Sequence, residues 1–209
     1  MTKHVHRFRQ SWLNTALRCP EQARADRAGE ILADRTTDSM ICGTAVHAGI
    51  EAALRNPQIG MPFALGYDAI DKVLQDQLAD GGWTQTKFSV DRVWERAYNC
   101  WDLWYDNVGQ TLAIDRVEEQ FEILVHEDDV REIWLTGTID AVDEQQQRVW
   151  DWKTASRPYE QWEYQRWAVQ PTVYTAAVGF EEFTYGIMLP ERGEWQTVSV
   201  WRDETHHAW

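Results

Sequence analysis

Apolar residues recur every three or four positions through most of the first half of the chain, and this spacing predicts a run of amphipathic helices. We expect a helix that Ser11 caps and that stops near Cys19-Pro20. A second helix should open at Gly43-Thr44 and end at Asn56-Pro57. Two further helices are expected over residues 69–78 and 93–105.

After Asp115 the pattern changes to alternation, which is typical of strands. Extended segments are predicted over residues 121–125, 133–142 and 149–153, and a hairpin over 183–201 that turns at 191–193. A helical region from about Glu160, broken or restarted at Pro171, lies before that hairpin. This order predicts a mixed α/β fold with a central sheet flanked by helices.

The composition favours one globular domain over residues 1–209, because 44% hydrophobic and 12% aromatic residues can fill one core. No segment approaches the roughly 20 apolar residues of a membrane span, and no signal peptide is recognisable. We therefore expect a cytoplasmic protein, bacterial or phage-encoded. The three cysteines, Cys19, Cys42 and Cys100, form no C-x-x-C pair, so reduced thiols are expected.

A net charge of −14 argues against a nucleic-acid partner, because Lys and Arg supply most of the affinity for phosphate. The distribution weakens that objection. Residues 1–35 hold seven Lys/Arg and four Asp/Glu, a balance of +3, which leaves −17 for the rest of the chain. Carboxylates that bind a cation would also count toward the negative total.

The most informative segment is Gly137-Thr138-Ile139-Asp140, followed after ten residues by Asp151-Trp152-Lys153. If both strands pair, the two aspartates approach one another, and Lys153 lies on the same side as Asp151. Mg²⁺ or Mn²⁺ would offset the repulsion between the carboxylates, and a lysine could stabilise charge that builds up on a phosphate. The pattern suits phosphodiester hydrolysis, although surface acids at strand ends would have the same spacing.

Five segments, in the same order, resemble the PD-(D/E)XK nuclease superfamily, in particular its RecB-like branch of phage exonucleases and CRISPR-associated nucleases. These segments are Ser11-Trp12-Leu13 with Cys19-Pro20, Gly43 to His47, Val117-Glu118-Glu119, Gly137 to Asp140 with Asp151 to Lys153, and Gln170 to Tyr174.

The resemblance implies a metal site for Mg²⁺ or Mn²⁺ whose ligands are His47, Asp140, Asp151 and the main-chain carbonyl of Trp152. An imidazole ligand would shift the preference toward Mn²⁺. The implied catalytic residues are Lys153, Asp140, Asp151 and Glu118. Glu119, on the other face of the strand, is a close alternative to Glu118.

The resemblance also implies that Gln170 and Tyr174 contact the DNA backbone or brace Lys153, although ordinary packing would explain them too. Pro171 departs from a smooth helix and leaves the placement of Gln170 open. We expect the basic N-terminal segment to hold the DNA backbone through Arg7, Arg9 and Arg18.

Many RecB-like nucleases hold an iron–sulfur cluster with a cysteine equivalent to Cys19 and three cysteines near the C-terminus. Because this chain has no cysteine after Cys100, no such cluster is expected, and Cys19 should be a small buried residue.

We therefore expect a metal-dependent DNA exonuclease of recombination, repair or phage replication that acts on DNA ends or single strands. A homo-oligomeric ring, as in some related exonucleases, and a recombination partner protein are further expectations. The alternative is a catalytically idle, acidic DNA mimic or scaffold with a nuclease-like fold, which would explain the charge of −14 more directly.

Overall fold

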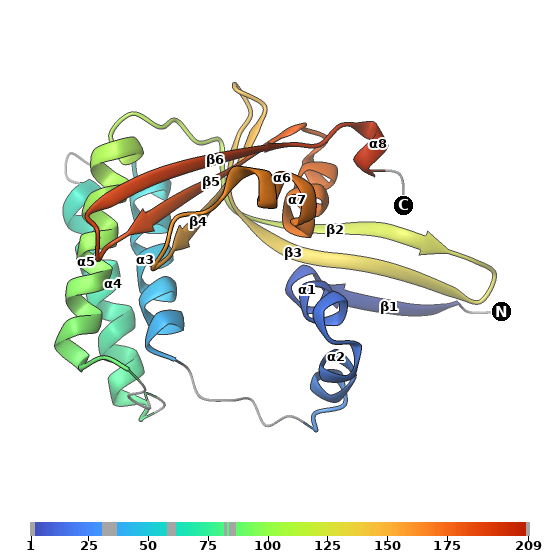
Figure 1. The fold of residues 1–209 in the computed structure, drawn as a ribbon, viewed down its shortest axis with the longest axis horizontal. Coiled ribbons are helices and arrows are strands. Elements are labelled where there is room, and N and C mark those ends of the chain that lie inside the picture. Colours follow the sequence, from blue (N-terminus) through green and yellow to red (C-terminus); the bar gives the residue numbers. More distant parts are fainter. Residues whose placement is uncertain (1–2, 31–36, 58–61, 82, 84–86, 208–209) are drawn as a thin grey trace.

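A twisted sheet of six strands runs through the computed structural model, which describes residues 3–30, 37–57, 62–81, 83 and 87–207 (Figure 1). The strands are β1 (His4–Arg9), β2 (Arg116–Glu127), β3 (Arg131–Asp143), β4 (Arg148–Thr154), β5 (Glu182–Leu189) and β6 (Glu194–Trp201). The expected mixed α/β class is confirmed.

Strand β3 has a short unpaired stretch on one edge. β2 pairs antiparallel with β3 along almost its whole length. β1 pairs in parallel only as far as Thr136, and β4 pairs antiparallel only from Ala141 onward. Because a strand has two edges, β1 and β4 share the edge opposite β2. Residues 137–140 lie between them, and we call this stretch the β3 gap.

Three long helices pack together at one end of the sheet: α3 (Asp38–Arg55), α4 (Pro62–Ala79) and α5 (Val90–Trp104), which continues into a π-helical turn, η1 (Tyr105–Gly109) (Figure 1). The core between them and the sheet is rich in tryptophan. Trp150 and Trp152 of β4 are buried and stacked 5.1 Å apart, and Trp104 of α5 meets Trp152 edge-on. Both β4 tryptophans are therefore part of the core.

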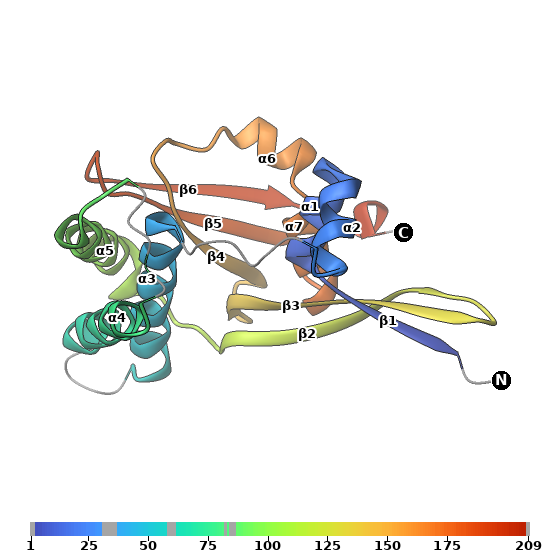
Figure 2. The same cartoon turned by 90° about the horizontal axis from the view of Figure 1, so that it is seen from below.

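The shorter helices lie toward the other end: α1 (Gln10–Arg18), α2 (Pro20–Arg27), α6 (Gln161–Trp167), α7 (Val169–Val178) and α8 (Glu204–His207) (Figure 2). A second hydrophobic cluster joins α7 to strands β3 to β6, with Val173 and Tyr174 packed among residues such as Ile139 and Phe183. Across the residues that the structure describes, no helix is both long and apolar enough to cross a membrane.

Several predicted boundaries were wrong. Ser11 lies inside α1, which begins at Gln10, and α3 begins at Asp38 because Thr37 caps it by accepting a bond from the Met40 amide at 3.3 Å. The sequence pattern also missed β1 and α2, which flank α1. β1 lacks a clear alternation, and it is stabilised by pairing with a strand more than 120 residues away.

Two further expectations need correction. The break between α6 and α7 falls at Ala168, and Pro171 lies in the first turn of α7, where its missing N–H costs no helical hydrogen bond. Cys19 is half-buried instead of fully buried, because it forms the extended junction between α1 and α2. Cys42 and Cys100 are buried free thiols.

Candidate active site

His47, Glu118 and Asp140 converge from three elements, α3, β2 and β3. Each offers one ligand atom, and these atoms all lie within 4.8 Å of one another. Nδ1 of His47 is 3.6 Å from Oδ2 of Asp140. One imidazole and two carboxylates suit Mn²⁺ and, through their oxygens, Mg²⁺.

An unusual backbone conformation turns Glu118 into this cluster. Val117 and Glu119 are aligned with Ala141 and Ile139 of β3, so Glu118 lies opposite Asp140. Its φ of 52° is in the left-handed region, which a residue other than glycine adopts at a cost. Glu119 instead forms an ion pair with Arg116 at 3.1 Å. Of the two acids that the sequence left open, the structure therefore brings Glu118 to the cluster.

The backbone of β4 is attached to the same cluster through Trp152. Its amide donates to Oδ2 of Asp140 at 2.7 Å, and its carbonyl oxygen lies 2.8 Å from Nε2 of His47. Because a carbonyl only accepts, Nε2 carries a proton, and a neutral ring then presents the lone pair of Nδ1 to the Asp140 carboxylate. Two electron-pair donors that face one another are stabilised by a cation between them, so these side chains fit a divalent metal. The Trp152 carbonyl, expected as a ligand, is engaged by His47.

Asp151 and Lys153 form a second group beside the first. Asp151 is only 2% exposed. Its Oδ2 is 2.5 Å from Nζ of Lys153, and its Oδ1 accepts a hydrogen bond from Gln170 of α7 at 2.6 Å. The structure thus brings Gln170 to Asp151, and Asp151 to Lys153, but the three-residue cluster of His47, Glu118 and Asp140 does not include Asp151.

The charges of the site follow from its burial. Burial raises the pKa of Asp140 to about 7; a positive charge on the His47 ring would oppose this rise, and the carboxylate of Asp151 adds to it. Burial also raises the pKa of Glu118. For Lys153 burial lowers the pKa, but Asp151 and Asp140 outweigh it, so the net shift is upward and the ammonium stays charged. A bound divalent cation would compensate this concentration of carboxylates.

Apart from Gln170, which contacts Asp151, the predicted DNA-binding residues fall in two places. Arg7, Arg9 and Tyr174 line one groove of about 650 Å³ beside the β3 gap. Arg7 also pairs with Glu122. Arg18, by contrast, is exposed at the end of α1 and is not among the lining residues of this groove.

Two residues of the site had weak or absent signals in the sequence. Gln10 lines the groove of Arg7 and Arg9 and is 4% exposed; its Nε2 has no hydrogen-bond partner in the described part of the chain. Glu51, one helical turn after His47, lines a pocket of about 400 Å³ together with His47 and Asp140 and pairs with Arg55 at 2.8 Å. The helical spacing of Glu51 from His47 was visible in the sequence, whereas nothing there marked Gln10.

Solved structures match this chain at low similarity, and a protein family matches most of its sequence. Among solved structures, that of SSO0001 matches with a TM-score of 0.33 at 11% identity, covering 90% of this chain and 78% of that one. A phage-related exonuclease from Haemophilus somnus 129PT matches with a TM-score of 0.33 at 13% identity, covering 77% of this chain and 85% of the other. No curated protein matches the sequence significantly. The sequence pattern of the PD-(D/E)XK nuclease superfamily matches residues 7–187. That span includes His47, Glu118, Asp140, Asp151 and Lys153, and the chain belongs to the PD-(D/E)XK nuclease superfamily.

Proposed function

We propose that this protein is a metal-dependent DNA exonuclease. The observation that carries the proposal is the convergence of His47, Glu118 and Asp140 beside the ion-paired Lys153, at the β3 gap of a nuclease-superfamily chain. The exonuclease assignment rests on the five-segment resemblance to the RecB-like branch.

His47, Glu118 and Asp140 would hold the divalent cation, with Asp151 completing the acidic site. When bound, the cation supplies positive charge beside the scissile phosphate and lowers the pKa of water. Lys153, kept charged by the two aspartates, would orient the attacking water and stabilise the charge that develops on the phosphate. Gln170 would fix Asp151, and through it Lys153.

The DNA backbone would lie along the groove of Arg7 and Arg9. On β3, Thr138 lines this groove, and Asp140 follows two residues later on the same face of the strand. A phosphate chain held by the two arginines would thereby lead to the acidic cluster.

The test uses end-labelled linear DNA and a closed circular plasmid, each with Mg²⁺, with Mn²⁺ and with excess EDTA. We expect degradation of the linear DNA alone, and only when metal is present. An Asp140→Asn variant serves as the inactive control. Equal cleavage of circular DNA would refute the exonuclease assignment, and cleavage in EDTA would refute the metal dependence.

The second candidate, an idle acidic DNA mimic or scaffold, is favoured by the net charge of −14. It predicts no cleavage of either DNA with either metal. The same assay therefore separates the two functions.

A further inference from the structure

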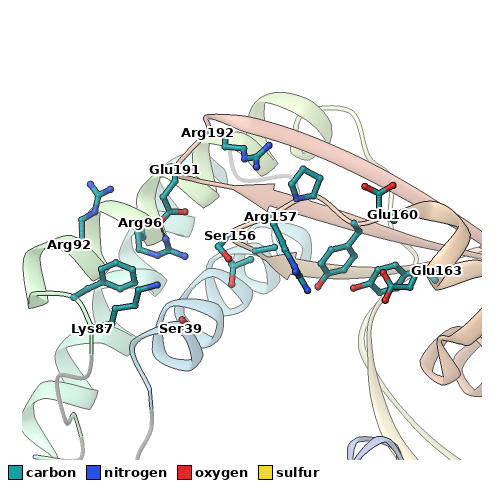
Figure 3. A pocket seen from close by; sticks show the side chains of 16 residues that line it. Ser39, Lys87, Arg92, Arg96, Ser156, Arg157, Glu160, Glu163, Glu191 and Arg192 are labelled. Carbon is teal, nitrogen blue, oxygen red and sulfur yellow. Dashed lines mark ion pairs between the residues drawn. The ribbon is translucent and has the colours of Figure 1, made fainter. Parts of the chain in front are cut away.

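Figure 3 shows a large cavity of the protein. It shares no lining residue with the groove of Arg7 and Arg9. Its volume is about 1140 Å³. Its wall includes Thr154, which directly follows Lys153 on β4, and the chain from there to Glu160. The opposite wall comes from the N-terminal turns of α3 and α5 and from the β5–β6 turn.

The cavity wall is basic, unlike the protein as a whole. Five cations outnumber three glutamates there, a local balance of +2 in a chain of net charge −14. The cations are Lys87, Arg92, Arg96, Arg157 and Arg192, and the acids are Glu160, Glu163 and Glu191. Such a concentration of positive charge in an acidic protein indicates an anionic ligand.

Arg96 is a fixed part of this wall. It is only 6% exposed, pairs with Glu191, and holds its guanidinium 5.1 Å from the centre of the Phe88 ring. Its Nε has no hydrogen-bond partner within the described residues. A buried guanidinium with an unused donor costs free energy unless a ligand or water satisfies it.

The cavity also carries a pair of stacked aromatic rings. Tyr159 and Tyr164 lie parallel, with ring centres 4.3 Å apart and an angle of 7° between their planes. The amide side chain of Gln196 accepts from the Tyr159 amide and donates to its carbonyl, both at 2.9 Å. The amide of Ala155 donates to the Met188 carbonyl at 2.9 Å. The wall is therefore anchored to β5 and β6 before any ligand binds.

We infer that this cavity binds a single strand of DNA next to the cleaved phosphate. Cations for the backbone together with an aromatic surface for bases are the combination that single-strand binding uses. The volume is somewhat above that of pockets for small ligands, so it would accommodate a few nucleotides of one strand and not a duplex. The inference rests on the proposed function and adds the form of the substrate.

The test measures binding without cleavage. A fluorescein-labelled hexathymidylate and a short blunt duplex are titrated with the protein in EDTA at several salt concentrations. The variants are Lys87→Ala, Arg157→Ala and their combination. Neither residue forms an ion pair with another described residue. Neither substitution therefore leaves a carboxylate of the described residues without its ion-pair partner. Lys72→Ala is the matched control, because Lys72 is an exposed lysine of α4 outside the cavity.

We expect the double variant to bind hexathymidylate about tenfold more weakly and to lose roughly 1.4 units of salt slope, about 0.7 for each phosphate contact. Lys72→Ala should bind like the unaltered protein. Unchanged affinity and slope in the double variant would overturn the inference, as would an equal loss for the blunt duplex.

Because binding and cleavage are measured separately, a failure of the cavity assignment can be told apart from a failure of the proposed function. If the unaltered protein degrades DNA and the double variant binds hexathymidylate normally, only the cavity assignment fails. If the unaltered protein cleaves no DNA but the double variant loses binding, the nuclease proposal fails and the single-strand site stands.

Discussion

The left-handed backbone at Glu118 leads to a prediction that separates the cost of the conformation from the role of the side chain. Both Glu118→Gly and Glu118→Ala remove the carboxylate. Only glycine adopts a φ of 52° without a steric penalty. The difference in stability between the two variants therefore reports effects of the backbone and not the loss of the carboxylate.

The expected magnitude follows from two opposing contributions. A left-handed conformation costs an L-residue roughly 1–2 kcal/mol, and alanine keeps that cost. Glycine removes it but loses about 0.5–1 kcal/mol through the greater entropy of the unfolded chain. From the middle of these two ranges, we expect Glu118→Gly to be more stable than Glu118→Ala by about 0.75 kcal/mol, or roughly 1.5–3 °C in Tm for a chain of this size.

The assay is thermal and urea unfolding in EDTA, so that metal binding does not contribute. The neighbouring Glu119, in the same strand but without a positive φ, is the matched control. There the order should reverse, because glycine weakens an extended strand. If Glu118→Ala equals or exceeds Glu118→Gly in stability, the conformation assigned to Glu118 is wrong.

The same variants test the metal cluster. A ligand that binds the folded state raises its stability, so Mn²⁺ should raise the Tm of the unaltered protein. Both Glu118 variants should lose most of this increase. A full increase in either variant would show that Glu118 is not a ligand.

Three other changes should affect distinct steps. Lys153→Ala should abolish most turnover while DNA affinity in Ca²⁺ stays nearly intact, because the ammonium is needed more in the transition state than in the ground state. Single-turnover rates at saturating DNA test this prediction, and a normal rate would contradict it. Gln170→Glu should lower activity more than Gln170→Ala, because it places a carboxylate against Asp151 where an amide now donates at 2.6 Å. The test is the pH dependence of the rate: recovery of activity in the Gln170→Glu variant at acid pH would support this cause. Equal losses of activity in both variants at every pH would contradict it. Arg9→Ala should weaken DNA binding and reduce by about one unit the slope of log affinity against log salt concentration. Titrations at several salt concentrations measure this slope, and an unchanged slope would show that Arg9 does not contact the DNA backbone.

The sequence by itself indicated the class of fold and most of the candidate site. Periodicity marked the long helices and the strands β2 to β6, because these elements bury one face and keep that face along the chain. The spacing of Asp151 and Lys153 predicted that their side chains lie on one side of the strand, and their ion pair confirms it.

Only the tertiary structure decided how the site is assembled. The β3 gap exists because β1 and β4 meet different parts of one edge of β3, and such pairing leaves no trace in local periodicity. The choice of Glu118 over Glu119 depends on a single left-handed residue, which a strand pattern cannot show. The basic cavity joins segments that are far apart in the chain, so its positive charge is hidden in a sequence whose total is −14, and only folding brings those cations together.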